Sequence, residues 1–172
     1  MSDTAAATPT AGEKVAAPRS LGSLKYPAVL GQIVSVLMRT PQHRQSFLSD
    51  LDWLVLPAIA TNQYALNEVT DNSTGATLPV AVALWAMVSE EVDQRLSSSA
   101  APHVRLKAAE WNSGTIPWLV EAAGEPRATG AIIRALLERR FASTGLKSIG
   151  RDDQGRTVVR VLKSPETSAA TG

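Results

Sequence analysis

Residues 78–88, with the sequence LPVAVALWAMV, decide the fold class of this chain. Apolar side chains occupy nearly every position of this stretch instead of every second one, which is typical of a central strand covered on both faces. The stretch is about half as long as the ~20 residues that a membrane-spanning helix needs, so we expect no transmembrane segment. Residues 63–70 also have a strand-like pattern, and the turn-rich sequence DNSTG at 71–75 joins the two segments.

Helices are predicted on both sides of these strands. Apolar residues in 26–38 recur with the i, i+3, i+4, i+7 spacing of an amphipathic helix. Thr40 and Pro41 then predict a second helix over 41–51, with Thr40 as its N-cap residue and Pro41 at its first position. After the long strand, Ser89 and the two glutamates that follow it predict a helix reaching about residue 96.

The C-terminal half is predicted to add three strands and one helix. Residues 116–123 form a strand candidate, and the sequence GEP at 124–126 ends it and opens a helix with one apolar face. Residues 147–151 and 157–163 predict a closing hairpin. This order of elements predicts an α/β fold, a central mixed sheet flanked by helices.

Length and composition point to one globular domain. The 172 residues and 18.2 kDa fit a domain at 25–163, between a disordered leader at 1–24 and a disordered tail at 164–172. The leader lacks the apolar core of a secretory signal, which favours a cytoplasmic location. A net charge of +1 gives no strong field to attract nucleic acid. The absence of cysteine excludes disulfides, thiolate zinc sites and a cysteine nucleophile, and with two histidines we expect no metal site.

His43 is the first candidate for chemistry. In the predicted helix over 41–51 it lies in the first turn, where the positive end of the helix dipole disfavours imidazolium and keeps the ring neutral. A general base or an acyl-accepting nucleophile needs a neutral imidazole. The alternative is a partly exposed polar residue of that turn. The other histidine, His103, lies in a polar stretch beside a proline and is interpreted as a surface residue.

Glu121 is the second candidate. It interrupts the otherwise apolar strand at 116–123, where a carboxylate is costly unless it is paired or used. Such a carboxylate can orient a histidine and stabilise its charge, or act as a base itself. The alternative is that strand alternation points Glu121 into solvent.

A third candidate is the strand–turn–helix sequence WLVEAAGEPRATGA at 118–131. The free N–H groups and the positive dipole end of such a helix can bind a phosphate. Gly124, Arg127 and Gly130 are the candidate residues, and the pattern R-x-x-G-A is similar to the phosphopantetheine-binding loop of the GNAT acyltransferases. The alternative is that glycine and proline serve only the turn.

Several blocks of the sequence, taken together, resemble one family. LPAIATNQY at 56–64 and EWNSGTIPW at 110–118 are the most distinctive, and TPQHR at 40–44 precedes them. In order and spacing they resemble the RTX toxin-activating lysine acyltransferases, the hemolysin-activating proteins of Gram-negative bacteria. The resemblance covers residues 30–141.

The resemblance implies a GNAT-like fold and a specific reaction. Members of that family transfer a fatty acyl group from acyl carrier protein to internal lysine ε-amino groups of an RTX protoxin, in the cytoplasm and before secretion. The implied donor is acyl-phosphopantetheine on the carrier protein, with no permanently bound cofactor. The implied partners are acyl carrier protein, the RTX protoxin and a second copy of the chain in a homodimer.

The resemblance also assigns roles to residues. The family's essential histidine corresponds to His43, with Thr40 where the family often has serine. Its second catalytic position, usually an aspartate, corresponds to Glu121, whose side chain is one methylene longer. Supporting roles are implied for Thr40 and for four residues of the distinctive blocks, namely Asn62, Trp111, Ser113 and Gly114.

Two mechanisms and two other functions remain open on the sequence. His43 either removes the proton from the attacking lysine or takes the acyl group first and passes it on. One other function is an acyltransferase of this fold with a different amine or protein acceptor. The second is a non-catalytic homologue that only binds the acyl carrier or the protoxin.

Overall fold

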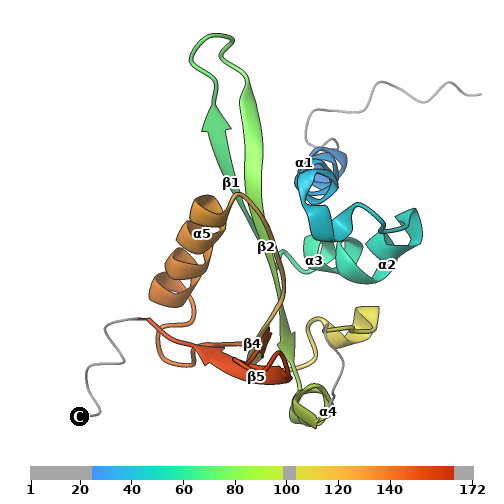
Figure 1. Ribbon diagram of the computed structural model, residues 1–172. Coiled ribbons are helices and arrows are strands. Elements are labelled where there is room, and N and C mark those ends of the chain that lie inside the picture. The colour runs from blue at the N-terminus through green and yellow to red at the C-terminus, as the bar shows by residue number, and fades with distance from the viewer. Residues whose placement is uncertain (1–24, 99–103, 165–172) are drawn as a thin grey trace, which may run out of the picture.

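The computed structural model describes residues 25–98 and 104–164 (Figure 1). The predicted leader at 1–24, His103 and residues 165–172 of the predicted tail lie outside the described residues. Ser164, which we assigned to the tail, is instead buried, with 7% of its surface exposed. Within the described residues, no helix has the length and apolar character needed to cross a membrane.

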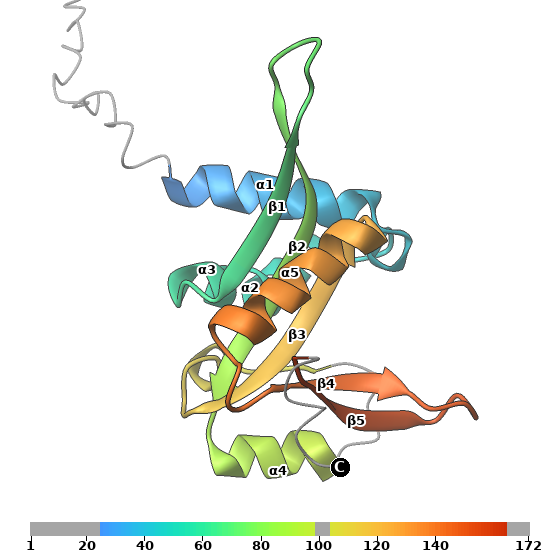
Figure 2. The same ribbon diagram turned by 90° about the vertical axis from the view of Figure 1, so that its left-hand side faces the viewer.

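The core of the fold is a sheet of five strands in the order β1-β2-β3-β4-β5. The strands are β1 (Tyr64–Thr70), β2 (Thr77–Val88), β3 (Ile116–Gly124), β4 (Leu146–Arg151) and β5 (Thr157–Leu162). Neighbours are antiparallel except β3 and β4, which are parallel and meet at the single pair Trp118 and Lys147. β4 and β5 therefore diverge from β3 (Figure 2). This arrangement confirms the predicted mixed sheet.

Helices cover both faces of the sheet. α1 (Lys25–Arg39), α2 (Leu51–Leu54) and α3 (Leu56–Ala60) lie on one side of β2, and α5 (Pro126–Arg139) lies on the other (Figure 1). α4 (Glu90–Ser98) follows the end of β2. Ile33 and Val82 belong to the core cluster on the α1 side, whereas Trp85 and Ile132 belong to the cluster on the α5 side. The strand covered on both faces is thus confirmed.

The predicted helix over residues 41–51 is wrong. The chain forms a short 3₁₀ turn at Pro41–His43 (η2), another at Leu48–Asp50 (η3), and only then α2. Thr40 does not cap a helix, because its Oγ1 donates to the carbonyl of Val36 at 3.0 Å. The start signals are present, but no apolar face supports a helix. Phe47 and Leu48, two of the three large apolar residues of the segment, are 76% and 84% exposed.

Candidate active site

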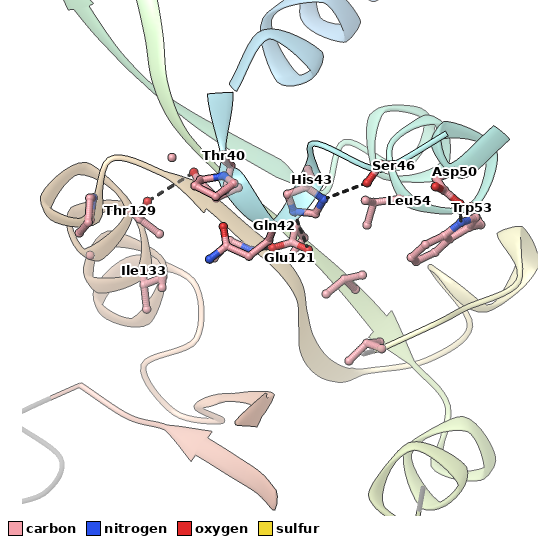
Figure 3. Close-up of a pocket in the computed structure, with 18 residues that line it drawn as sticks. Thr40, Gln42, His43, Ser46, Asp50, Trp53, Leu54, Glu121, Thr129 and Ile133 are labelled. Atoms are coloured by element: carbon pink, nitrogen blue, oxygen red, sulfur yellow. Dashed lines mark hydrogen bonds and ion pairs between the residues drawn. The ribbon is translucent and has the colours of Figure 1, made fainter. Parts of the chain in front are cut away.

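A cleft of about 890 Å³ lies between η2, β3, α2 and the start of α5. His43 and Glu121 face each other near its middle (Figure 3). The cleft brings together segments that are far apart in sequence. Its lining comprises Thr40, Pro41, Gln42, His43, Ser46, Asp50, Trp53, Leu54, Val104, Val120, Glu121, Ala122, Ala123, Gly124, Pro126, Thr129, Gly130 and Ile133.

A β-bulge in β3 directs Glu121 into this cleft. The register of β2 with β3 shifts so that Leu84 pairs with Glu121 while the next residue of β2, Trp85, pairs with Leu119. Val120 is therefore an extra residue, and both Val120 and Glu121 line the cleft. Strict alternation from Leu119 would have put Glu121 on the α5 face with Leu119 itself. The bulge is thus the local cause of the site.

The end of α1 fixes the position of His43. The Arg39 guanidinium donates to the backbone carbonyl of Pro79 in β2, and its Nε donates to the Ser35 carbonyl at 2.9 Å. These contacts tie the last turn of α1 to the sheet. His43 follows directly, because its backbone N–H donates to the Thr40 carbonyl at 3.0 Å and closes η2.

His43 and Glu121 form a hydrogen-bonded pair, and each ring nitrogen of His43 has its own neighbour. His43 Nε2 lies 3.3 Å from Glu121 Oε2, and the other ring nitrogen, Nδ1, lies 3.5 Å from Ser46 Oγ. Glu121 Oε1 accepts a hydrogen bond from the backbone N–H of Ala122 at 2.9 Å, which holds the carboxylate in place. The two side chains are 13% and 24% exposed, so a substrate can reach them.

The pair raises the pKa of His43 above its ordinary value. The largest cause is the hydrogen bond to Glu121, and the charge of Glu121 adds to it, while partial burial opposes both. The prediction of a ring kept neutral by a helix dipole is therefore wrong, because η2 is three residues long and Glu121 faces the ring. A raised pKa makes the neutral imidazole a stronger base, which suits proton removal from an amine.

The predicted phosphate-binding turn is only partly in the cleft. Gly124 and Gly130 line it, whereas Arg127 is exposed and is not part of the lining. The Glu125 side chain caps α5 by accepting from the Ala128 N–H at 2.7 Å, and this bond lowers the pKa of Glu125. An anion at this helix end would have to displace the Glu125 carboxylate.

Gly124 has a structural reason to be glycine. Its φ is +113°, and a Cβ there would lie 2.2 Å from the backbone oxygen of Val80. The same oxygen accepts the backbone N–H of Glu125 at 2.9 Å. Gly124 therefore allows β3 to pass close to β2 where the chain turns into α5.

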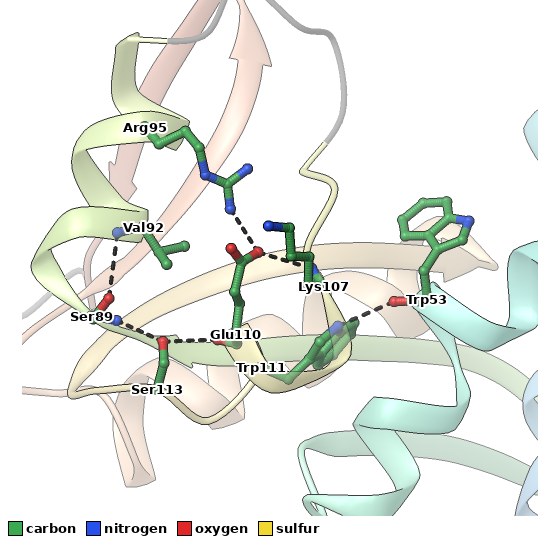
Figure 4. Close-up of polar contacts among 8 residues, drawn as sticks. All are labelled: Trp53, Ser89, Val92, Arg95, Lys107, Glu110, Trp111 and Ser113. Carbon is green, nitrogen blue, oxygen red and sulfur yellow. Dashed lines mark hydrogen bonds and ion pairs between the residues drawn. The ribbon is translucent and has the colours of Figure 1, made fainter.

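Of the residues to which the resemblance gives supporting roles, Thr40 lines the cleft, whereas Asn62, Trp111, Ser113 and Gly114 lie outside its lining. Figure 4 shows the contacts of Trp111 and Ser113. Trp111 is fully buried, and its Nε1 donates to the carbonyl of Trp53 at 3.1 Å. Ser113 Oγ accepts from the Ser89 N–H at 3.0 Å. A Cβ on Gly114 would lie 2.5 Å from a backbone oxygen of β2. Asn62, with φ 56°, turns the chain from α3 into β1.

Sequence reasoning missed two residues of the site. Ser46 faces His43 Nδ1, and the spacing of three residues would have put both on one side of the predicted helix. Trp53 also lines the cleft, and its Nε1 donates to Asp50 at 3.1 Å. No motif marks Trp53. Within 25–98 and 104–164, no three histidine or acidic side chains cluster as metal ligands would.

Comparison with known proteins identifies the family. The model of the RTX toxin acyltransferase family matches residues 23–165. One similar protein is the RTX-II toxin-activating lysine-acyltransferase ApxIIC of Actinobacillus pleuropneumoniae, 32% identical over 93 residues. The aligned part covers 54% of this chain and 52% of that protein, so the chain spans about half the length of the curated relative it matches. On the family match, the chain belongs to the RTX toxin acyltransferase family.

Proposed function

We propose that this chain transfers a fatty acyl group from acyl carrier protein to lysine ε-amino groups of an RTX protoxin. The observation that carries the proposal is the contact of 3.3 Å between His43 Nε2 and Glu121 Oε2 in an open cleft. Family membership supports the reaction class. The carrier protein as donor, the protoxin as acceptor, a homodimer and a cytoplasmic location are parts of this proposal.

The pair supplies the proton acceptor that the reaction needs. A lysine amine has an ordinary pKa of about 10.4 and is protonated near neutral pH, so it must lose a proton before it attacks. Glu121 holds His43 through Nε2, which leaves Nδ1 to accept that proton. Ser46 Oγ, 3.5 Å from Nδ1, is too weakly bound to block a substrate amine.

The transfer then balances as follows. The neutral lysine nitrogen forms a bond to the thioester carbonyl carbon of the acyl donor, and the second amine proton passes to solvent water as the amide forms. The carbon–sulfur bond breaks, and its electron pair goes to sulfur. The leaving thiolate takes a proton from the His43 imidazolium, which returns to the neutral base. Glu121 stabilises the imidazolium during the interval between these steps.

Mass spectrometry tests the proposal. An RTX protoxin is co-expressed with this chain and examined for lysines that carry an acyl group. The proposal expects modification by the wild-type chain and its loss in both His43→Ala and Glu121→Ala. His103→Ala, at the second histidine, and Glu138→Ala, on the exposed side of α5, are matched controls that should keep the activity.

Other results would contradict the proposal in different ways. Modification that survives His43→Ala would refute the role of this histidine and leave family membership intact. No modification by the wild-type chain, with acyl carrier protein present, would favour another acceptor or a protein that only binds. If the acyl-loaded carrier protein then bound directly to the inactive wild-type chain, that result would favour a protein that only binds.

A further inference from the structure

The cleft has two arms, one on each side of the His43–Glu121 pair (Figure 3). One arm runs over the end of β3 and the start of α5 and includes Thr129 and Ile133. The other arm runs towards α2 and includes Trp53 and Leu54. A substrate whose reacting atoms lie beside the pair would therefore extend into both arms.

The arm on the α2 side has an apolar floor. Leu54, Val104 and Val120 line it and belong to the main hydrophobic core, and the first two are only 5% and 3% exposed. The indole of Trp53 forms part of the wall. An alkyl chain in this arm would contact carbon atoms that continue into the core, and it would bury no polar group of the floor.

The polar groups at the rim of this arm are already paired with one another. The two oxygens of Asp50 accept from the Phe47 backbone N–H at 2.8 Å and from Trp53 Nε1 at 3.1 Å. The guanidinium of Arg105 lies 5.1 Å from the centre of the Trp53 ring. Because the Asp50 carboxylate, the Phe47 N–H and the Trp53 indole N–H satisfy each other, an apolar occupant leaves none of these three groups without a partner.

We propose that the arm formed by Trp53, Leu54, Val104 and Val120 holds the fatty chain of the donor and sets which chain lengths are used. The inference rests on the proposed function. A thioester carbonyl beside His43 has its sulfur on one side and its alkyl chain on the other. The alkyl chain suits the apolar α2 side, which leaves the α5 side for the amide-containing arm that follows the sulfur. Each further methylene buried there improves affinity by about fourfold.

Chain-length selectivity tests the inference. The wild-type protein, Val104→Phe and Ile133→Phe are each assayed with carrier protein that is loaded with a short or a long acyl group. Val104→Phe narrows the apolar arm, so kcat/KM for the long donor should fall at least tenfold more than kcat/KM for the short one. Ile133→Phe, the matched control in the opposite arm, should lower both by the same factor. The assignment would be overturned if Val104→Phe lowered kcat/KM equally for both donors, or if Ile133→Phe lowered kcat/KM selectively for the long donor. The second result would put the alkyl chain on the α5 side.

A binding measurement separates this inference from the proposed function and does not depend on how well Val104→Phe folds. The probe is a pantetheine thioether, which cannot transfer its chain, with a bromine at the end of the alkyl group. It should quench tryptophan fluorescence in the wild-type chain, and Trp53→Phe should remove most of that quenching. Trp111 and Trp118 are fully buried, and neither they nor Trp85 line the cleft. Equal quenching in both proteins, or none in either, would refute the site. Quenching without protoxin acylation would keep the alkyl site and refute the proposed function.

Discussion

Shortening Glu121 by one methylene, in Glu121→Asp, is expected to slow acyl transfer by about 10²-fold. The carboxylate now lies 3.3 Å from His43 Nε2, near the outer limit of a hydrogen bond. Removing a methylene withdraws the carboxylate by roughly 1.5 Å, the length of one C–C bond, which takes it out of reach. Misplacing a catalytic group by about 1 Å costs on the order of 10²-fold in rate, which sets the size of the effect.

The rate is measured as acylation of a protoxin at saturating loaded carrier protein, followed by intact mass. Glu138→Asp, at an exposed glutamate of α5, is the control and should keep the wild-type rate. Thermal unfolding of both variants checks that they fold. A wild-type rate in Glu121→Asp would refute the reasoning, because it would show that the close contact with His43 does not contribute to the chemistry.

Four further changes test the packing of the fold and the pairing of His43 with Glu121. Trp118→Phe removes the bond of 2.8 Å from Nε1 to Asp93 and leaves a void in the core, so it should lower the unfolding free energy by about 2–4 kcal/mol in denaturant titrations. Gly114→Ala puts a Cβ 2.5 Å from a backbone oxygen and should destabilise by about 1–3 kcal/mol. Gly31→Ala, in α1 with open space around it, should instead stabilise the fold by about 0.5–1 kcal/mol. A change of the same sign in the unfolding free energy of both glycine variants would contradict the packing argument. Because the pKa of His43 is raised in the folded protein, its stabilising effect is complete below the ordinary value of 6.5 and is lost as the pH rises through the raised value. The difference in unfolding free energy between wild type and His43→Gln should therefore shrink over that range. A difference that grows with pH would contradict the pairing.

The fold was predictable where apolar residues mark both faces or one face of an element. The run at 78–88 predicted β2 and its two-sided burial, and the structure places the strand at Thr77–Val88. The apolar spacing at 26–38 predicted α1. The segment 41–51 failed because its cap signals are local, whereas a helix of that length needs an apolar face to pack, and Phe47 and Leu48 are exposed.

The sequence predicted which residues belong to the candidate site, but not how they are arranged in space. A carboxylate in an apolar strand and a histidine after a proline drew attention to Glu121 and His43. Their meeting depends on the extra residue Val120 in β3, and a bulge leaves no mark in a pattern of period two. The resemblance implied a supporting role for Ser113, and its hydroxyl bonds to the backbone of Ser89 and Glu110, outside the cleft lining.

The pH dependence of single-turnover acylation tests whether the paired His43 is the proton acceptor. Glu121 raises the pKa of His43, so the rate of the wild-type chain should rise with pH along a limb centred above 6.5. In Glu121→Gln the charge is lost, and the limb should move to lower pH while the maximum rate falls. A limb at the same pH in both proteins would contradict the role of His43 as a base held and tuned by Glu121.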